Sequence, residues 1–576
     1  MPDQQTQDLS TYKVSSDGNE LSGTTNLVSV VVEKSINRIP FARIVFKDGD
    51  AAAADFKNSS NTNFEPGKNL KIEAGFHSQN QVIFEGIIIR QRITLKNGRD
   101  SFLVVEARDV AYKMTLERKN KYYIKASDSD VVDTITGLYS ISNDIDDTKI
   151  QHHQMVQYNC TDWDFAVTRM EMNGMYVWPN NGKLICKKPA INNPADTTAI
   201  FGTDVISLDV TLDASHQYDT VSCKAWSSSN QDISSSDNDS AALPDTGDLK
   251  SSALVGKVNG SSINYRHSGI LTEDELKSWA NAQQTKYQLS KTRGTITCKG
   301  NLEAAPAATI SLKGFGDHYN GNYFISAVRN ELKESLWETT IQFGWWPELF
   351  TEQFPVNQPA ASGIIPSVNG MQIGIVTALS SDPESEFRIQ IKLPLMDNDD
   401  EGIWARIALL DAGNQRGSFF MPDLHDEVLV GFINDDPRHP VVMGMFNSSA
   451  KPAPFTPSDD NYQKGFVTKS KLKITFDDDK KIILIETPAG NSITLDEDQH
   501  KIILLDEHSN KIEMSSDGIS VESSKDIMLK ASGDVKAQGV NIDMKASAMV
   551  KAEGNSNATI QSSGNTVVKG TTVSIN

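Results

Sequence analysis

The sequence contains few cysteines and no long apolar run. Its four cysteines, Cys160, Cys186, Cys223 and Cys298, are far apart, with no CxxC pair and no histidine at ligand spacing. This spacing favours buried free thiols over a disulfide framework. No segment approaches the ~20 apolar residues of a membrane-spanning helix. The first residues, Met-Pro-Asp-Gln-Gln, lack the basic and apolar regions of a secretory signal. The sequence therefore predicts a protein made in the cytoplasm without a signal peptide.

The chain also lacks an excess of basic residues. Its 55 Lys and Arg stand against 75 Asp and Glu, which gives a formal net charge of −20. Nucleic acids and anionic lipids are bound by clustered Lys and Arg, so this balance disfavours both kinds of partner. An acidic surface instead favours solubility and discourages non-specific association.

Recognisable catalytic and metal-binding motifs are missing. There is no HExxH, GxSxG or Walker-type loop. The acidic segment Asp397–Gly402 resembles the start of a calcium loop, but Ala408 stands where a bidentate glutamate is required, which favours a solvated turn. The pair His152-His153 has no carboxylate or cysteine at ligand spacing, so we expect a surface or core pair. The sequence thus predicts no enzyme, no cofactor, and no catalytic, cofactor-binding or metal-binding residues.

Abundant Val, Ile, Thr and Ser with frequent turn residues predict a mainly β protein, and 576 residues predict several domains. Lys47-Asp-Gly-Asp50 is typical of a hairpin turn, and the Ser-, Asp- and Asn-rich segment 227–262 predicts a mobile loop. Helices are predicted after the capping residues Ser127, Thr161 and Thr272. Strands are predicted at five early positions: 27–32, 42–46, 70–74, 82–89 and 102–107.

The last hundred residues repeat. The segment from Ile527 to Gly539 matches the one from Ile542 to Gly554, and each contains an apolar-x-apolar step about every eight residues. Before them, Lys481-Ile-Ile-Leu-Ile-Glu is echoed by Lys501-Ile-Ile-Leu-Leu-Asp at a period of about 20 residues. Periodic self-similarity of this kind is typical of a solenoid.

The arithmetic of the repeat favours a needle of three chains. If one chain supplied all three faces, residues 519–576 would give barely two and a half coils, a poorly stabilised stack. If three chains supply one face each, the same residues give about seven layers, roughly 35 Å at ~4.8 Å per layer. The predicted inward-facing needle core consists of Val521, Leu529, Val535, Met544, Val550, Ile560, Val568 and Val573.

Residues 366–447 carry the most specific resemblance. Trp404-Ala-Arg-Ile, Arg416-Gly-Ser-Phe-Phe-Met-Pro-Asp, Asp426-Glu-Val-Leu-Val-Gly-Phe and the run from Asp436 to Asn447 occur in that order. Together they resemble the OB-fold of VgrG proteins, the spikes of type VI secretion and related extracellular contractile injection systems. More weakly, Asn37-Arg-Ile-Pro-Phe-Ala resembles the phage-hub-like region of that family, and Val568-Lys-Gly570 fits its octapeptide repeat. Oligonucleotide binding is not expected of this OB-fold, because aromatic and basic residues are not interleaved. We expect Trp404, Phe419 and Phe420 to pack in the barrel core.

The resemblance implies a domain order: a hub-like region at 1–355 with two tube-like β-barrels and a helical insert, an OB-fold at 366–447, a linker at 448–470, and a triple-stranded β-helix needle at 471–576. It implies a homotrimer whose hub presents pseudo-six-fold symmetry to a hexameric inner tube. Further implied partners are baseplate proteins, effector cargo and, transiently, a target membrane. A PAAR-type tip protein would dock at the end of the needle, near Ile575 and Asn576.

The leading hypothesis is therefore a structural, non-enzymatic spike in an injection particle that is delivered outside the cell. Two alternatives stay open: the hub-spike of a bacteriophage tail, and a spike with cell-wall or glycan hydrolase activity. The ~24 residues between the OB-fold and the needle leave little room for an inserted catalytic domain, and nothing follows Asn576.

Overall fold

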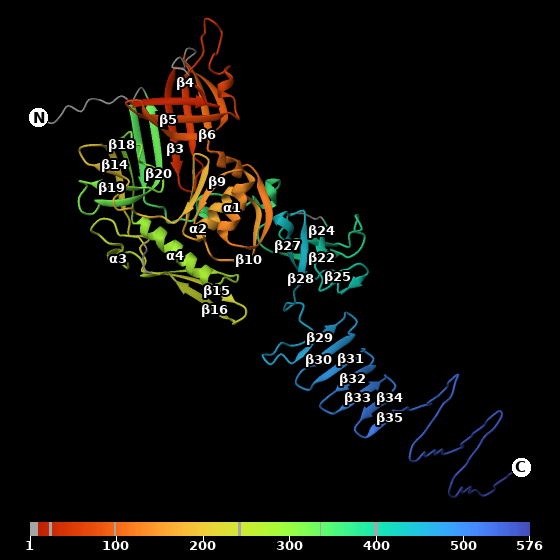
Figure 1. Ribbon diagram of the computed structural model, residues 1–576. Helices are drawn as coiled ribbons and strands as arrows, with labels where there is room; N and C mark the ends of the chain where they lie inside the picture. The colour runs from red at the N-terminus through yellow and green to blue at the C-terminus, as the bar shows by residue number, and fades with distance from the viewer. Residues whose placement is uncertain are drawn as a thin grey trace. The chain divides into compact units, whose positions relative to one another are not determined.

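The computed structural model describes residues 10–21, 26–96, 100–239, 243–333, 336–396 and 401–575. The chain divides into two compact units, Met1–Ser367 and Val368–Asn576. Strands dominate both units, so the predicted mainly β fold is confirmed (Figure 1). Asn576 and residues 397–400 of the calcium-loop-like segment lie outside the described residues. Among the described helices, none combines the length and apolar character needed to cross a bilayer.

The first unit is built on one large sheet. Within the described residues it has 13 strands, in the order β14-β18-β21-β20-β3-β4-β7-β6-β5-β1-β2, with β19 paired to both β20 and β13. Its strands are β1 (Ser10–Ser16), β2 (Asn19–Glu20), β3 (Leu27–Ser35), β4 (Phe41–Lys47), β5 (Asn69–Phe76), β6 (Gln79–Lys96), β7 (Asp100–Arg108), β13 (Thr197–Ile200), β14 (Val205–Leu212), β18 (Thr292–Lys299), β19 (Thr309–Lys313), β20 (Gly321–Lys333) and β21 (Leu336–Phe343).

Alternation along these strands explains the core. Every second side chain of β4 is buried, including Ile44 and Phe46, and so are Val30 and Val32 in the middle of β3, as expected for strands with one face against the interior. Phe46 packs on Phe64 with ring centroids 4.8 Å apart. The five early strands predicted from the sequence are all present. The two strand-rich regions that the resemblance assigns to separate barrels are joined here by antiparallel pairing of β3 with β20.

The hairpin predicted at Lys47–Asp50 is wrong. β4 pairs with β3 and β7 rather than with the next strand, β5. Asp48 instead opens a long connection that contains the short helix η1 (Thr62–Phe64). Its buried carboxylate accepts hydrogen bonds from the backbone N–H groups of Asn58 and Ser59. An Asp-Gly pair suits a hairpin turn, but here the carboxylate organises the connection instead.

A helical insert follows the first seven strands. Helix α1 starts at the predicted cap, where Ser127 and Asp130 form a capping box, and its Val131 and Ile135 are buried. Helix α2 starts after Thr161, also as predicted. The elements are η2 (Val110–Thr115), β8 (Arg118–Ala126), α1 (Asp128–Leu138), β9 (Ser142–Ile145), β10 (His152–Thr161), α2 (Asp162–Met172), β11 (Tyr176–Asn180) and β12 (Lys183–Lys187).

Asn37, in the Asn-Arg-Ile-Pro segment, fastens this insert to the large sheet. Its backbone is left-handed, with φ 56°, which asparagine tolerates better than most residues. Its N–H donates to the carbonyl of Val177 at 2.7 Å, and its side-chain Oδ1 accepts from the N–H of Val177 at 2.8 Å. Asn37, which lies two residues after the end of β3, therefore satisfies both backbone groups of Val177, a buried residue on β11.

A third group of elements surrounds α4, the helix predicted after Thr272, which again forms a capping box. The predicted mobile loop at 227–262 is wrong in part, because residues 232–237 form β16 and pair with β15. The remaining elements of the unit are β15 (Thr220–Ser227), β16 (Asp232–Asp237), α3 (Ser251–Leu254), β17 (Ser262–His267), α4 (Glu273–Ser290), α5 (Phe350–Gln353) and η3 (Ala360–Gly363).

The second unit begins with a closed five-stranded barrel, β22-β23-β24-β28-β27. Its interior includes Val376, Ile391, Ala405 and Val430. The expectation that Phe419 and Phe420 pack in this core is wrong: their side chains are 80% and 54% exposed. Trp404 is only half-buried and is not part of the core cluster either. The elements are β22 (Gln372–Ala378), β23 (Ile389–Lys392), β24 (Ile403–Ile407), β25 (Ala412–Gly413), β26 (Arg416–Gly417), β27 (Glu427–Phe432), η4 (Ile433–Asp435) and β28 (Pro440–Met445).

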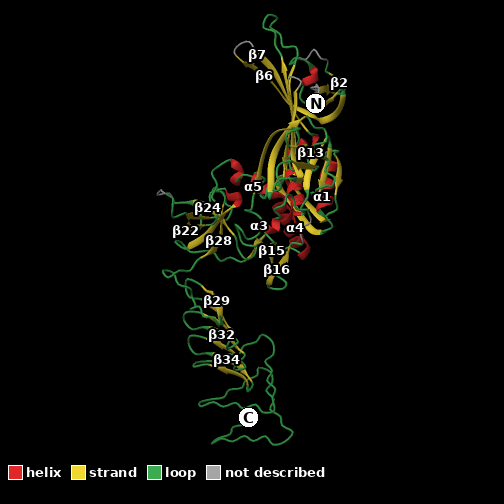
Figure 2. Cartoon of the chain, turned by 90° about the vertical axis from the view of Figure 1, so that its left-hand side faces the viewer, coloured by secondary structure: helices red, strands yellow, loops and turns green. Residues whose placement is uncertain are grey.

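A separate sheet follows the barrel, and Figure 2 shows its short strands one after another along the chain. They are β29 (Gln463–Val467), β30 (Lys473–Asp477), β31 (Ile482–Glu486), β32 (Ser492–Asp496), β33 (Lys501–Leu505), β34 (Lys511–Ser515) and β35 (Gly518–Glu522). This tail sheet starts at Gln463, inside the segment predicted as a linker. Residues 523–575 are described without further strands.

We predict that Asn37→Ala destabilises the first unit measurably. Loss of the side chain leaves the buried N–H of Val177 without its partner, which costs about 1–3 kcal/mol, and alanine at positive φ adds roughly 1–2 kcal/mol. Calorimetry of the full chain should show a lower unfolding temperature for the first unit. Asn37→Gly, which relieves the backbone strain but still lacks the acceptor, should fall between Asn37→Ala and the wild type. An Asn37→Ala chain that melts like the wild type would contradict this role.

Candidate assembly interface

The tail sheet is a chain of hairpins whose period matches the repeat seen in the sequence. Each strand has five residues and pairs antiparallel with the next. The turns after β31 and β33 are built alike: the N–H of Thr487 donates to the carbonyl of Asn491, and that of Asp506 to Asn510. In both turns the asparagine amide also donates to the side chain of its partner, at 3.2 Å and 2.7 Å. One sequence repeat of about 20 residues therefore corresponds to two strands and two turns.

The register of these strands gathers apolar side chains on one face. Ile474 pairs with Ile485, Ile485 with Ile493, and Ile493 with Leu504. Directly paired residues share a face of a sheet, so the apolar residues form two adjacent columns. We call this surface the apolar tail face; it consists of Phe466, Ile474, Phe476, Ile483, Ile485, Ile493, Leu495, Ile502, Leu504, Ile512, Met514, Ile519 and Val521.

The opposite face of the tail sheet carries charged residues that pair across strands. Lys473 lies 3.0 Å from Glu486, and Lys501 lies 3.1 Å from Glu513. Such exposed pairs contribute little stability each, but they make this face compatible with water. The same face also carries Ile482, Leu484, Ile503 and Leu505. The tail sheet therefore has one apolar face and one mixed face that holds its charged residues.

Among the described residues, no further layer covers the apolar tail face from β30 to β34. From β30 to β34 its ten side chains are 37% to 42% exposed, and none of the described residues from 463 to 575 is fully buried. Soluble proteins rarely leave a contiguous apolar surface of this extent in water. The arrangement therefore marks an interaction surface and, since it extends over every strand of the sheet, an extended one.

The predicted needle-core residues lie partly on this face. Val521 belongs to it, opposite Ile512. The other seven, from Leu529 to Val573, lie in the segment described without strands and are exposed in the single chain, as is Ile575. Sequence reasoning placed the core only after residue 519 and missed the apolar tail face before it. The signal was present: every strand from β30 to β35 contains an Ile-x-apolar step, such as Ile483-x-Ile485 and Ile493-x-Leu495.

Apart from this surface, metal-ligating groups and cysteines are the next candidates for a site. Across the described ranges, no cluster of three His, Cys, Asp or Glu side chains is arranged to hold a metal ion. The predicted free thiols are confirmed for all four cysteines, three of them buried. Burial raises the pKa of Cys223 to about 12 and that of Cys298 to about 11, so these thiols are poor nucleophiles.

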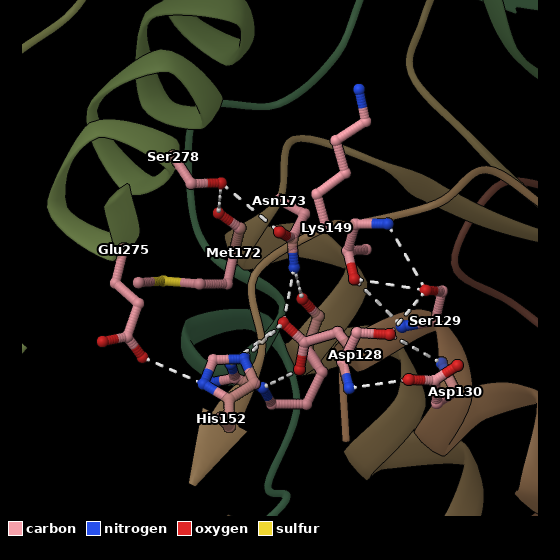
Figure 3. A network of polar contacts seen from close by, with 12 residues as sticks. Asp128, Ser129, Asp130, Lys149, His152, Met172, Asn173, Glu275 and Ser278 are labelled. Carbon is pink, nitrogen blue, oxygen red and sulfur yellow. Dashed lines mark hydrogen bonds and ion pairs between the residues drawn. The ribbon is translucent and has the colours of Figure 1, made fainter. Parts of the chain in front are cut away.

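His152 has partners that its sequence neighbourhood did not reveal (Figure 3). Its Nε2 lies 3.2 Å from Asp128 on α1, and its Nδ1 lies 3.1 Å from Glu275 on α4. Asp128 also receives hydrogen bonds from Arg169, at 2.6 Å, and from the amide of Asn173, at 2.8 Å. These carboxylates are far from His152 in sequence, so local spacing could not show them. The cluster ties the insert to the first turn of α4.

The charges within this cluster are mutually satisfied. Hydrogen bonds to Asp128 and then Glu275 raise the pKa of His152 to about 9, so the ring is a cation at neutral pH. The hydrogen bond from His152 lowers the pKa of Glu275 to about 2. Burial alone would raise the pKa of Asp128, but its bonds to His152 and Arg169 bring it below the usual value. A cation held between two anions suits a structural clamp better than a proton-transfer site.

Comparison with protein-family models identifies the family of this chain. Residues 6–334 match the family model described as the Alg8 N-terminal domain. The chain belongs to this Alg8 family. Residues 372–446, which include the closed barrel, match the type VI secretion system/phage-baseplate injector OB domain. The predicted OB-fold is therefore confirmed.

A curated relative points in the same direction. Over 157 residues this Alg8-family chain is 24% identical to the type VI secretion system spike protein VgrG3 of Vibrio cholerae. The match covers 25% of this chain, which spans only 15% of the length of that relative. Together with the injector OB domain, it confirms the predicted resemblance to VgrG-type spikes.

Solved structures with partial likeness include phage and secretion components. A 43 kDa tail protein of prophage MuSo2 from Shewanella oneidensis has 11% identity and a TM-score of 0.45, covering 59% of this chain and 98% of its own. An E. coli component of the type VI secretion system has 12% identity and a TM-score of 0.40, covering 75% and 100%. A Francisella PdpA–VgrG complex has 11% identity and a TM-score of 0.41, covering 90% and 80%.

The His152 clamp predicts a pH dependence for the Alg8-family unit. Because the pKa of His152 is raised above its unfolded value of ~6.5, the stabilisation is complete below pH ~6.5 and is lost as pH rises through about 9. Below pH 6.5 the wild type should exceed His152→Gln by roughly 2–3 kcal/mol in unfolding free energy, and the gap should shrink above pH 9. Urea unfolding at pH 6 and pH 9.5 measures it. A gap of equal size at both values would contradict the clamp.

Proposed function

We propose that this protein is the homotrimeric spike of a contractile injection machine. In this role its first unit joins the hexameric inner tube, its OB-fold barrel forms a collar, and its tail forms a needle that meets the target membrane. The family membership, the injector OB domain and the likeness to VgrG3 support a structural tail role. The observation that carries the trimer is the uncovered apolar tail face.

Association of three copies would bury the apolar tail face. Three tail sheets can stand as the sides of a triangular prism, with the apolar columns inside and the mixed faces outside. Two copies packed face to face would also cover the columns, but three copies match the three-faced coil that the eight-residue repeats after Glu522 favour. At ~4.8 Å between strands, the seven described strands give a shaft roughly 30 Å long. Because all strand pairing in this stretch runs within one chain, side-chain packing holds the copies together here.

The repeats beyond Glu522 extend the same shaft. Their apolar-x-apolar steps shorten to about eight residues, too few for a hairpin but enough for one strand and one corner of a shared coil. We propose that Leu529, Val535, Met544, Val550, Ile560, Val568 and Val573 turn inward when three chains wind together as a β-helix. The exposure of these residues in a single copy supports this reading.

The proposed partners follow from the two ends. The tube protein and baseplate would meet the large sheet of the first unit, and a PAAR-type tip protein would meet the end of the needle near Ile575. Effector cargo is a further partner that VgrG-type spikes suggest. In this proposal the protein works as part of an assembled particle delivered out of the producing cell.

We propose no catalytic activity for the chain. The most polar buried cluster, around His152, consists of groups that neutralise one another. The bacteriophage hub-spike alternative shares the same mechanics, so the origin of the particle would separate the two. A spike with hydrolase activity would cleave peptidoglycan or glycan in a dye-release assay, and we expect none from the purified full chain.

The trimer is tested on the apolar tail face. We predict a wild-type mass of about 190 kDa by light scattering, three times the 63.3 kDa of one chain. The variant Ile485→Asp/Ile493→Asp changes two paired residues on the face and should shift the mass to that of a monomer, because buried carboxylates without partners cost several kcal/mol.

The matched control lies on the opposite face of the same strands. Leu484→Asp/Thr494→Asp also alters a directly paired position, but on the face that the proposed prism leaves in water, and it should remain trimeric. A wild-type protein that is monomeric at all concentrations would contradict the proposed trimer. A trimer that survives the Ile485/Ile493 change would show that the tail face does not drive assembly.

A further inference from the structure

A short hairpin projects from the OB-fold barrel between β24 and β27. We call residues 408–421 the arm. Its two strands, β25 and β26, have only two residues each, and Ala412 pairs with Gly417. The N–H of Ser418 donates to the carbonyl of Asp411 at 2.9 Å, which extends the hairpin by one step. The arm is a two-stranded element with no third strand to support it.

The conformation of the arm is set by local contacts. One guanidinium nitrogen of Arg416 donates to both carboxylate oxygens of Asp411, at 2.7 and 2.9 Å. Gly417 has φ 133°, and a Cβ there would lie 2.3 Å from the carbonyl oxygen of Asp411. Only glycine allows that approach. The hairpin therefore has a defined shape before it meets anything.

The arm carries large apolar side chains into solvent. Leu410 precedes Asp411 and Phe419 follows Ser418, so both residues flank the Asp411–Ser418 hydrogen bond at the base of the hairpin. Their side chains are 92% and 80% exposed. Isolated two-stranded hairpins are marginal in water, and a fully exposed Leu–Phe pair forgoes about 2–3 kcal/mol per side chain of burial. A preformed hairpin with an exposed apolar pair has the features of a docking element.

The occupant is indicated by what adjoins the arm. Phe420, the residue after Phe419, stacks on Phe466 with ring centroids 5.3 Å apart. Phe466 is the first member of the apolar tail face, so the exposed apolar surface runs from the tail sheet onto the base of the arm. Lys469 and Asp423, 3.3 Å apart, hold the same junction. The chains that cover the tail face would therefore also pass beside the arm.

The barrel itself offers a matching receptor. Its outer wall exposes Ile373 on β22 and Met443 on β28. Methionine side chains adapt to the shape of an inserted group better than branched ones. Since arm and wall are different surfaces of one barrel, a contact between them is heterologous, and such contacts close into rings when the rotation allows.

We propose that the arm of each copy packs Leu410 and Phe419 against the wall around Ile373 and Met443 of the OB-fold barrel in the neighbouring copy. The proposal rests on the proposed trimer and deepens it: a ring of arm-to-wall contacts in the collar adds to the covered tail face. Each copy both gives an arm and receives one.

The test uses Leu410→Ser/Phe419→Ser in the full chain, with sedimentation velocity over a dilution series. We expect the trimer of this variant to dissociate at a concentration at least ten-fold higher than the wild-type trimer. The matched control is Phe387→Ser, which removes an equally exposed phenylalanine, 89% accessible, from another loop of the same barrel; its dissociation should match the wild type. Circular dichroism should show intact barrels, because neither Leu410 nor Phe419 belongs to the barrel core.

A second variant tests the receiving side. Met443→Ser should weaken the trimer in the same direction, and combining it with the arm changes should add less than the sum, because the two surfaces act in one contact. If the wild type is a trimer and the arm variant dissociates at the same concentration as the wild type, the arm inference is overturned, whereas the proposed trimer is not. If the arm and Phe387 variants weaken the trimer equally, the contact is not specific to the arm and the inference fails. A monomeric wild type would instead overturn the proposed function itself.

Discussion

The structure of the second unit depends on one constraint: a single-layer β-sheet with an apolar face cannot remain uncovered in water. The strands of the tail sheet satisfy their backbone hydrogen bonds within one chain. The side chains of Ile474, Ile485, Ile493 and Leu504 nevertheless lie side by side, and no further layer of described residues covers them. Free energy from apolar burial is proportional to the area removed from water. We propose that association with other copies supplies that area, which would couple the fold of the tail to the oligomer.

The first unit solves the same problem internally. Its 13-stranded sheet covers its apolar residues with strands, helices and loops of the same chain, as in the clusters around Phe46 and Ile341. Specific polar contacts then join its parts: Asn37 holds β11, and His152 holds the first turn of α4. This contrast shows how one chain combines a first unit with its own covered core and a tail whose apolar face is exposed.

Local signals allowed much of this fold to be predicted from the sequence. Capping residues Ser127, Thr161 and Thr272 marked three helices correctly, because capping depends on residues within one turn. The OB-fold was recognisable because its motif runs over many residues in order. Asp48–Gly49 was misread as a hairpin because strand partners are chosen by the whole sheet, which pairs β4 with β7. The partners of His152 and the exposure of Phe419 depend on tertiary contacts that no local spacing encodes. The apolar tail face could have been found from its alternation, but the antiparallel register that aligns its columns could not.

The central claim is that three copies bury the apolar tail face around a common axis. A cryo-electron microscopy reconstruction of the full-length protein tests it most directly. The account predicts a three-fold shaft in which the side chains of Ile474, Ile493 and Leu504 point to the axis while Lys473, Glu486 and Glu513 face solvent. A shaft with these orientations reversed, or particles that contain a single chain with an uncovered tail sheet, would contradict it.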